Sequence, residues 1–121
     1  MSALNEFDPF VEQIAKFFSL LSEPSRLKIV HVICREERNV TEIVTLTGLT
    51  QTNVSRQLNI MLSAGVLTRR KEGNQAFFKV SDETLIEVCR DVCVRLASKM
   101  ATDADLAKAA KKPFLLGMAM K

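Results

Sequence analysis

Three cysteines are the side chains in this sequence that could bind a metal ion or react with a thiol-modifying compound: Cys34, Cys89 and Cys93. Cys89 and Cys93 are four residues apart, so in a helix they share one face with their Cβ atoms roughly 6 Å apart. Because a disulfide needs about 3.8 Å between Cβ atoms, a direct bond within an intact helix would be strained. A thiophilic ion fits better, since bonds of about 2.3 Å to each sulfur let the sulfurs stand about 3.8 Å apart.

Soft metal and metalloid ions are the species that these thiols are suited to bind. Thiolates prefer trivalent arsenic or antimony, or cadmium, so arsenite, antimonite and cadmium are the candidate ligands of the three cysteines. Cysteine is also among the most often buried residues, and packing in the core is the alternative interpretation. His31 is the only histidine and lies three residues from Cys34. With one histidine, we expect no His-rich zinc site.

A second group of candidate residues lies between Thr50 and Ala64. An apolar stripe at helical spacing predicts one buried face there, formed by Val54, Leu58, Met61 and Leu62. The other face and the first turn carry short polar side chains and one arginine: Gln51, Thr52, Asn53, Ser55, Arg56 and Asn59. No acidic residue occurs between Glu42 and Glu72. Such a face avoids repulsion from phosphates, while its Arg, Asn and Gln side chains can read base edges. A surface helix that lacks acids by chance is the alternative.

The positive charge of the chain is concentrated around this helix. Residues 1–49 have a net charge of −2 and residues 81–120 are neutral, whereas residues 50–80 have a net charge of +4. Part of this excess is a basic run beside a predicted turn, Arg69, Arg70 and Lys71. We expect these three side chains to hold backbone phosphates or to enter the minor groove, where they would contribute affinity and salt dependence more than sequence choice.

The elements that must position these side chains are mainly helices. Asp8-Pro9 predicts the start of a first helix, because Asp caps helices and Pro suits the first turn. Ser22 to Ser25 predicts the start of a second helix. A short third helix is expected over Thr41 to Thr47, with inward-facing residues Ile43, Val44 and Leu46. Gly48 closes it, Thr50 caps the fourth helix, and Gly65 ends that helix.

Beyond Gly65 the apolar period changes from helical to two. Val66 to Lys71 and Gln75 to Val80 therefore predict two strands, joined by a turn at Gly73-Asn74. Ser81 to Glu83 begins a long final helix, and Asp103 to Lys112 could form a short further helix. The predicted fold is mainly α with a small β-hairpin, in the order α-α-α-α-β-β-α. This order is that of a winged helix-turn-helix.

The final helix carries apolar residues around most of its circumference. A helix of this kind must be covered from two sides, one by its own domain and the other most simply by a partner chain. We therefore expect a homodimer of single domains spanning residues 1–121. The DNA-reading core would occupy about residues 22–80, and the dimerising helices about residues 9–21 and 82–101.

The ordered motifs of the chain resemble the ArsR/SmtB family of winged-helix repressors. The resemblance covers roughly residues 15–96 and is carried by the segments Leu20–Ile29, Val40–Ile43, Gly48–Leu58, Ala64–Leu67 and Arg70–Phe78. It implies a transcriptional repressor that dimerises through its first and last helices, binds an inverted-repeat DNA operator and is released by an inducer.

The sequence departs from this family where inducers act. Many members carry Cys-x-Cys at the start of the third helix, but the matching positions here are Asn39 and Thr41. Asp91-Val92-Cys93 resembles the start of a zinc motif, yet Ala104 and Ala107 at its later positions cannot ligate zinc. Some members sense arsenite through last-helix cysteines. Others sense persulfide or oxidants through a cysteine pair between the second and last helices, which Cys34 with Cys89 or Cys93 would form here.

Composition argues against several other classes of protein. Hydrophobic residues make up 47% of the chain and charged residues 26%, which is typical of a globular protein. No apolar run approaches a membrane span, no signal-peptide pattern begins the chain, and an odd number of cysteines does not suit a disulfide framework, so we expect a cytoplasmic location.

No catalytic motif is visible either. There is no Gly-rich phosphate loop and no nucleophile–base pairing at a readable spacing, so an enzyme is not expected. The alternative to a DNA-binding repressor is a winged helix that serves only as a protein-interaction module.

Overall fold

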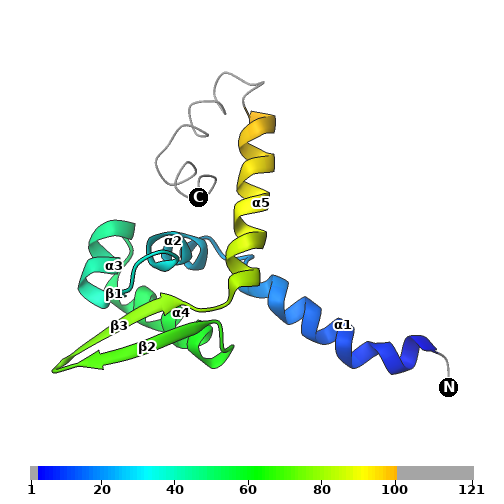
Figure 1. Ribbon diagram of the computed structural model, residues 1–121, viewed down its shortest axis with the longest axis horizontal. Coiled ribbons are helices and arrows are strands. Elements are labelled where there is room, and N and C mark those ends of the chain that lie inside the picture. The colour runs from blue at the N-terminus through cyan, green and yellow to red at the C-terminus, as the bar shows by residue number, and fades with distance from the viewer. Residues whose placement is uncertain (1–2, 101–121) are drawn as a thin grey trace.

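The structure is a computed structural model that describes residues 3–100 as five helices and one small sheet (Figure 1). In chain order the elements are α1 Ala3–Leu20, α2 Pro24–Ile33, β1 Arg38–Asn39, α3 Val40–Thr47, α4 Gln51–Ser63, β2 Leu67–Glu72, β3 Gln75–Val80 and α5 Glu83–Met100. The predicted order of helices and hairpin is confirmed. The helix expected over Asp103 to Lys112 lies outside the described residues. Among the described helices, none combines the length and the apolar character needed to cross a membrane.

The α3–α4 pair forms the helix-turn-helix, and local side chains fix its ends. Asn39 and Glu42 form a reciprocal capping box at the start of α3. Gly48 follows the last turn of α3 with φ +74°, a left-handed conformation that an L side chain rarely adopts. Thr50 then caps α4, since its side chain accepts a hydrogen bond from the backbone N–H of Asn53 at 3.1 Å.

The sheet has one more strand than the sequence predicted. Its order is β1-β3-β2, with β3 antiparallel to both neighbours. Strand β1 is only two residues long and pairs Arg38 with Phe78 and Asn39 with Phe77. Two residues cannot display an alternating pattern, so only the pairing with β3 identifies this strand.

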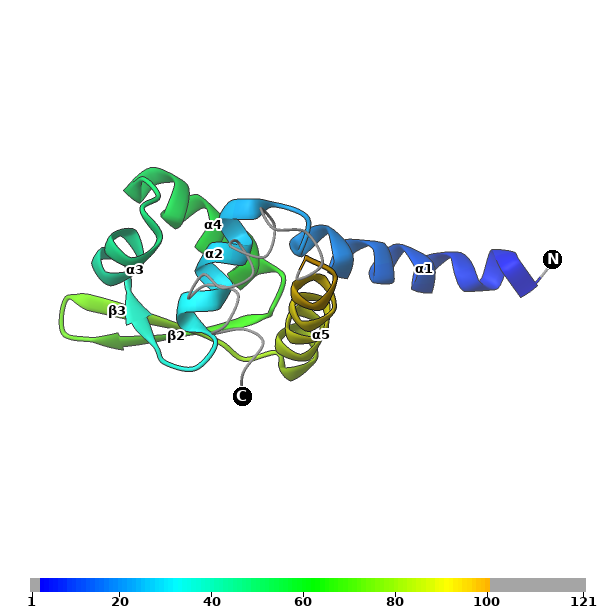
Figure 2. The same cartoon turned by 90° about the horizontal axis from the view of Figure 1, so that it is seen from above.

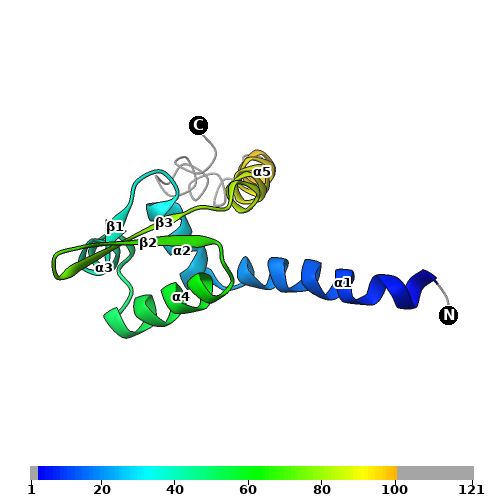
Figure 3. The ribbon, with the colours of Figure 1, turned by 60° about the horizontal axis from the view of Figure 1, so that its bottom comes forward.

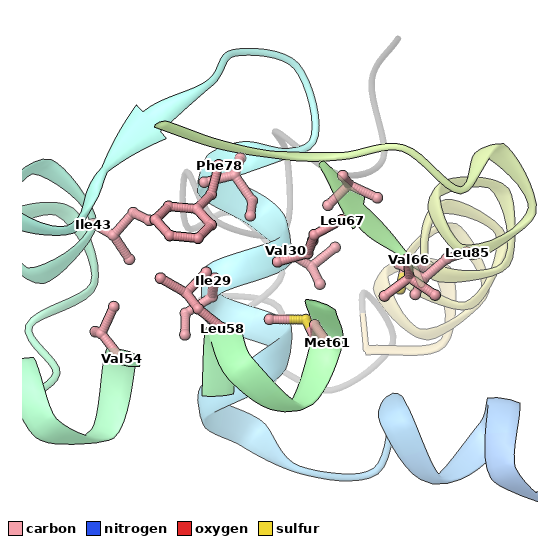
Figure 4. Close-up of a cluster of buried hydrophobic side chains, with 13 residues drawn as sticks. Ile29, Val30, Ile43, Val54, Leu58, Met61, Val66, Leu67, Phe78 and Leu85 are labelled. Carbon is pink, nitrogen blue, oxygen red and sulfur yellow. The ribbon is translucent and has the colours of Figure 1, made fainter. Parts of the chain in front are cut away.

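The core lies where α2, α3, α4, the hairpin and the start of α5 meet (Figure 4). It is formed by Ile29, Val30, Ile33, Ile43, Val54, Leu58, Met61, Val66, Leu67, Phe78, Val80, Leu85 and Cys89. The inward face predicted for α4 is confirmed. For α3 the prediction is wrong at Leu46, which is 52% exposed. Helix α3 packs through the stripe of Val40, Ile43 and Val44, and Leu46 lies at the edge of that stripe, next to Ile43 but away from Val44.

Helix α1 extends away from this core (Figures 1 and 2). It begins at Ala3 rather than at Asp8, and Pro9 lies inside it, so the predicted helix start is wrong. Proline lacks a backbone N–H and so removes one hydrogen bond of the helix, yet α1 continues through Pro9 to Leu20. Much of the helix surface is apolar and exposed, at Phe7, Phe10, Val11, Ile14 and Phe18.

Helix α5 joins the core only through its first turns. Asp82 accepts a hydrogen bond from the backbone N–H of Leu85 at 3.1 Å and so caps the helix start. Leu85 and Cys89 are buried. Farther along, apolar side chains are exposed at Val92, Val94 and Leu96.

We expect Leu58→Ala to lower the free energy of unfolding by about 2–5 kcal/mol, because Leu58 is 1% exposed at the centre of the core. Leu46→Ala is the matched control and should change it by less than about 0.5 kcal/mol. Urea unfolding followed by circular dichroism measures both. Equal losses for the two variants would contradict the described core.

Candidate nucleic-acid interface

Helix α4 presents a polar face on the side opposite its buried stripe. Gln51, Thr52, Arg56 and Asn59 are exposed, and Ser55 is half-buried. Val54, Leu58 and Met61 anchor the helix from the other side. The structure therefore gathers five of the six predicted α4 residues on or beside one accessible surface. Helix α4 also contacts β2, so the hairpin lies next to the helix that carries this surface (Figure 3).

Asn53, the sixth predicted residue, is engaged inside the protein. Its Nδ2 donates to Ser25 Oγ at 3.0 Å, which links α4 to α2. Its Oδ1 accepts hydrogen bonds from Gln57 Nε2 at 3.1 Å and from Arg56 Nη2 at 3.2 Å. Asn53 thus holds the Arg56 guanidinium at the edge of the exposed face.

Two residues of this region were missed by the sequence analysis. Gln57 is 3% exposed, and its Oε1 accepts a hydrogen bond from Arg26 Nη1 at 2.9 Å. Arg26 also donates through Nε to the carbonyl of Leu20 and through Nη2 to that of Ser19, each at 3.0 Å. The spacing contained a signal, because Gln57 is three residues after Val54 and four before Met61. It is the polar member of the apolar stripe.

The three basic residues of the hairpin are divided between its two faces. Successive side chains of a strand point to opposite faces. Arg69 and Lys71 therefore share the face of buried Leu67, whereas Arg70 lies on the other face, opposite Phe77 of β3. Arg69 and Lys71 are exposed near the end of the hairpin.

Arg70 is held by two carboxylates and an aromatic ring. Its Nη2 lies 2.6 Å from Glu37 Oε1, its Nη1 lies 2.6 Å from Glu72 Oε2, and its guanidinium carbon lies 4.8 Å from the centre of the Phe77 ring. The hydrogen bonds to Glu37 and Glu72 raise the pKa of Arg70, and the bond from Arg70 lowers the pKa of Glu37. Arg70 thereby ties the hairpin to the turn between α2 and β1.

Of the three thiols, Cys34 lies at the end of α2, and Cys89 and Cys93 lie one turn apart in α5. Cys34 Sγ donates to the His31 carbonyl at 3.4 Å. Burial, together with repulsion from the charged forms of Cys93 and Cys34, raises the pKa of the Cys89 thiol to about 11. Burial also raises the pKa of both Cys34 and Cys93. At neutral pH all three groups are protonated thiols.

A metal centre is not evident in this part of the chain. Over residues 3–100, no three or more His, Cys, Asp and Glu side chains form a group that could hold a metal ion. Burial and the charge of Arg35 lower the pKa of His31, so its neutral form is favoured.

Comparison with known proteins identifies the fold and the family. Residues 23–69 match the family described as "Bacterial regulatory protein, arsR family". The HTH-type transcriptional regulator Rv0081 of Mycobacterium tuberculosis is 31% identical over 106 residues, covering 84% of this chain and 93% of that protein. Its crystal structure superposes with a TM-score of 0.66 at 30% identity, covering 75% of this chain and 95% of that one.

Two further matches agree. A probable mercury resistance operon repressor of Streptomyces lividans is 33% identical over 89 residues, covering 74% of this chain and 67% of that protein. The homodimeric winged helix-turn-helix DNA-binding domain Mb0332 of Mycobacterium bovis has a TM-score of 0.71 at 24% identity, covering 86% and 94% of the two chains. The chain therefore belongs to the arsR family of bacterial regulatory proteins and is a winged helix-turn-helix transcriptional regulator that binds DNA, not an enzyme.

Proposed function

We propose that this regulator is a repressor whose α4 helix enters the major groove of an inverted-repeat operator. The observation that carries the proposal is the exposed, acid-free face of α4, together with the exposed basic residues Arg69 and Lys71 on the hairpin that α4 contacts. Amide, hydroxyl and guanidinium groups on such a face can hydrogen-bond base edges. The base-reading residues proposed are Gln51, Thr52, Ser55, Arg56 and Asn59.

The hairpin would bind the phosphate backbone beside this groove. Arg69 and Lys71 are exposed on one face of the hairpin, whereas Glu72, the one acidic residue of β2 and β3, lies on the other face and pairs with Arg70. Their charges are therefore available to phosphates. Arg70 and Asn53 do not contact DNA in this proposal. Arg70 holds the hairpin in place through Glu37, and Asn53 holds the side chain of Arg56.

A second copy of the chain is the proposed partner for α1 and α5. Exposed phenylalanines on α1, such as Phe10 and Phe18, and exposed Val92 and Leu96 on α5 need cover from water. The homodimeric state of Mb0332, which shares the fold, supports a homodimer here. A two-fold dimer presents two α4 helices and so matches an inverted-repeat operator. We propose that this complex of regulator and DNA forms in the cytoplasm.

The proposed release signal acts on the thiols. Cys34 ends α2, which packs against the recognition helix α4, whereas Cys89 and Cys93 belong to α5. An agent that bonds to thiols on both helices would change how α5 sits on the DNA-reading core. The similarity to a mercury resistance operon repressor supports an inducer with affinity for thiolates. Arsenite, cadmium and a persulfide donor represent the three chemistries to be compared.

Salt dependence tests the DNA-binding surface. We expect the double variant Arg69→Gln, Lys71→Gln to bind more weakly to every duplex, because phosphate contacts do not depend on sequence. The slope of log affinity against log salt concentration should fall by about 0.9 for each phosphate contact removed. Fluorescence anisotropy with a duplex selected by the wild type from a random library, and with an unrelated duplex, measures this slope.

Lys79→Gln is the matched control on the neighbouring strand. It removes one exposed positive charge from the hairpin face opposite Arg69 and Lys71, so the slope should change less. An unchanged slope in the double variant would remove the hairpin from DNA binding. Binding of the wild type that is insensitive to salt would favour the protein-interaction alternative.

The reactivity of Cys89 should rise steeply with pH. Only the thiolate is alkylated, and with a pKa of about 11 its fraction should grow about tenfold per pH unit between pH 7 and pH 10. Iodoacetamide labelling of the native protein, followed by mass spectrometry of the Cys89 peptide, measures the rate. In urea the rate should level off near pH 9. A native rate that levels off below pH 9 would contradict the burial of this thiol.

Operator release tests the thiol signal. We expect at least one of arsenite, cadmium and the persulfide donor to release the reduced wild type from its selected duplex, because these agents bond to thiolates. Single variants Cys34→Ser, Cys89→Ser and Cys93→Ser should keep DNA affinity, while variants at the bonded thiols lose release. Equal release of a triple Ser variant, or no release of the wild type, would refute the thiol mechanism and leave the DNA-binding proposal standing.

A further inference from the structure

Arg26 links three helices through its hydrogen bonds. It lies in the first turn of α2, where its backbone N–H donates to Glu23 Oε2 at 3.0 Å. Its guanidinium donates to the carbonyls of Ser19 and Leu20 in the last turn of α1, and to the side-chain carbonyl of Gln57 on α4. One side chain therefore joins the end of α1, the start of α2 and the middle of α4.

The chemistry of this junction makes it costly to break. The carbonyls at the end of a helix lack partners within the helix and carry partial negative charge, so a planar cation satisfies them well. Gln57 is 3% exposed, so its Oε1 would be a buried acceptor without a partner if Arg26 were absent. Its Nε2 continues the connection to Asn53, which holds Arg56 at the edge of the exposed face.

Helix α1 has little else to fix its direction. It runs away from the body of the protein, and only its last residues, Phe17 and Leu20, pack against the core (Figures 1 and 3). The three residues from Leu21 to Glu23 then turn the chain into α2. The bonds from Arg26 are thus the polar link between the direction of α1 and the position of α4.

We propose that Arg26 is a positioning residue that sets the distance between the two recognition helices, and with it the half-site spacing that the regulator accepts. The inference rests on the proposed function, in which α1 carries the partner chain. If the two copies pair through their α1 helices, a small change in the angle between α1 and α4 produces a displacement that grows with distance along α1. This displacement changes the distance between the two α4 helices of the dimer.

Spacing selectivity is the readout that tests this role. The probe is the duplex that the wild type selects from a random-sequence library, together with duplexes in which one or two base pairs are added or removed at its centre. Each base pair shifts one half-site by about 3.4 Å and rotates it by about 35°. We expect the wild type to prefer the selected spacing, and Arg26→Met to reduce that preference roughly tenfold or more, the scale of one charge-assisted hydrogen bond.

Two further variants separate positioning from general damage. Gln57→Met keeps the bonds from Arg26 to α1 but removes the link to α4, so it should reduce the preference as Arg26→Met does. Arg26→Lys keeps the charge but not the planar set of donors, and should fall between wild type and Arg26→Met. Lys28→Met is the matched control, because it removes one exposed positive charge from the same helix and should leave the preference unchanged.

The outcomes distinguish the two proposals. Variants that lose affinity equally on all spacings, with the preference retained, would show that Arg26 is merely structural and overturn the inference. The proposed function would survive that result. A wild type that selects no duplex, or that light scattering shows to be monomeric, would overturn the proposed function and this inference with it. Should Arg26→Met fail to fold, Gln57→Met and Arg26→Lys decide the question.

Discussion

Burial of one stripe of α4 against α2 is the constraint on which the rest of this structure depends. Val54, Leu58 and Met61 are at most 1% exposed and meet Ile29 and Val30 in the core (Figure 4). Because a helix is rigid and its side chains are fixed in angle around the axis, burying this stripe determines which residues face outward. Hydrophobic packing on one side thereby produces a polar surface of defined composition on the other.

In the hairpin, burial of one face also determines which side chains face outward, but with the two-residue repeat of a strand. Pairing of Leu67 with Val80 turns both side chains into the core, and strand alternation then places Arg69 and Lys71 on that face. Arg70 must lie on the opposite face, where Glu37, Glu72 and Phe77 receive it. Three consecutive basic residues therefore perform two tasks. Two offer charge to solvent, and the third fixes the strand that carries them.

Helix α2 connects the different parts of the molecule. Through Arg26 and Ser25 it meets α4 with polar contacts, and through Cys34 its end lies near the thiols of α5. A change imposed on either neighbour would therefore act on a single short element in the core. This arrangement gives a physical route by which the contacts of α5 and α1 affect the recognition helix, since packed elements shift as units rather than deform.

The sequence by itself determined the elements whose signals are local and repeated. These signals depend on neighbours a few residues away, and the sequence analysis predicted each of them: the α4 stripe, the Gly48 turn, the Thr50 cap and the period of two beyond Gly65. The acid-free face of α4 followed from them. Pro9 shows the limit of local signals, because its position suits a helix start although the helix begins at Ala3.

Tertiary structure alone decided which residues meet across long separations in the chain. Strand β1 exists only because Arg38 and Asn39 pair with β3. The Arg26–Gln57 hydrogen bond joins positions 31 residues apart, and the Arg70–Glu37 pair joins positions 33 apart. Leu46 could be assigned to solvent only once α3 was packed. These outcomes depend on how elements pack rather than on which residues adjoin, so periodicity and capping signals do not contain them.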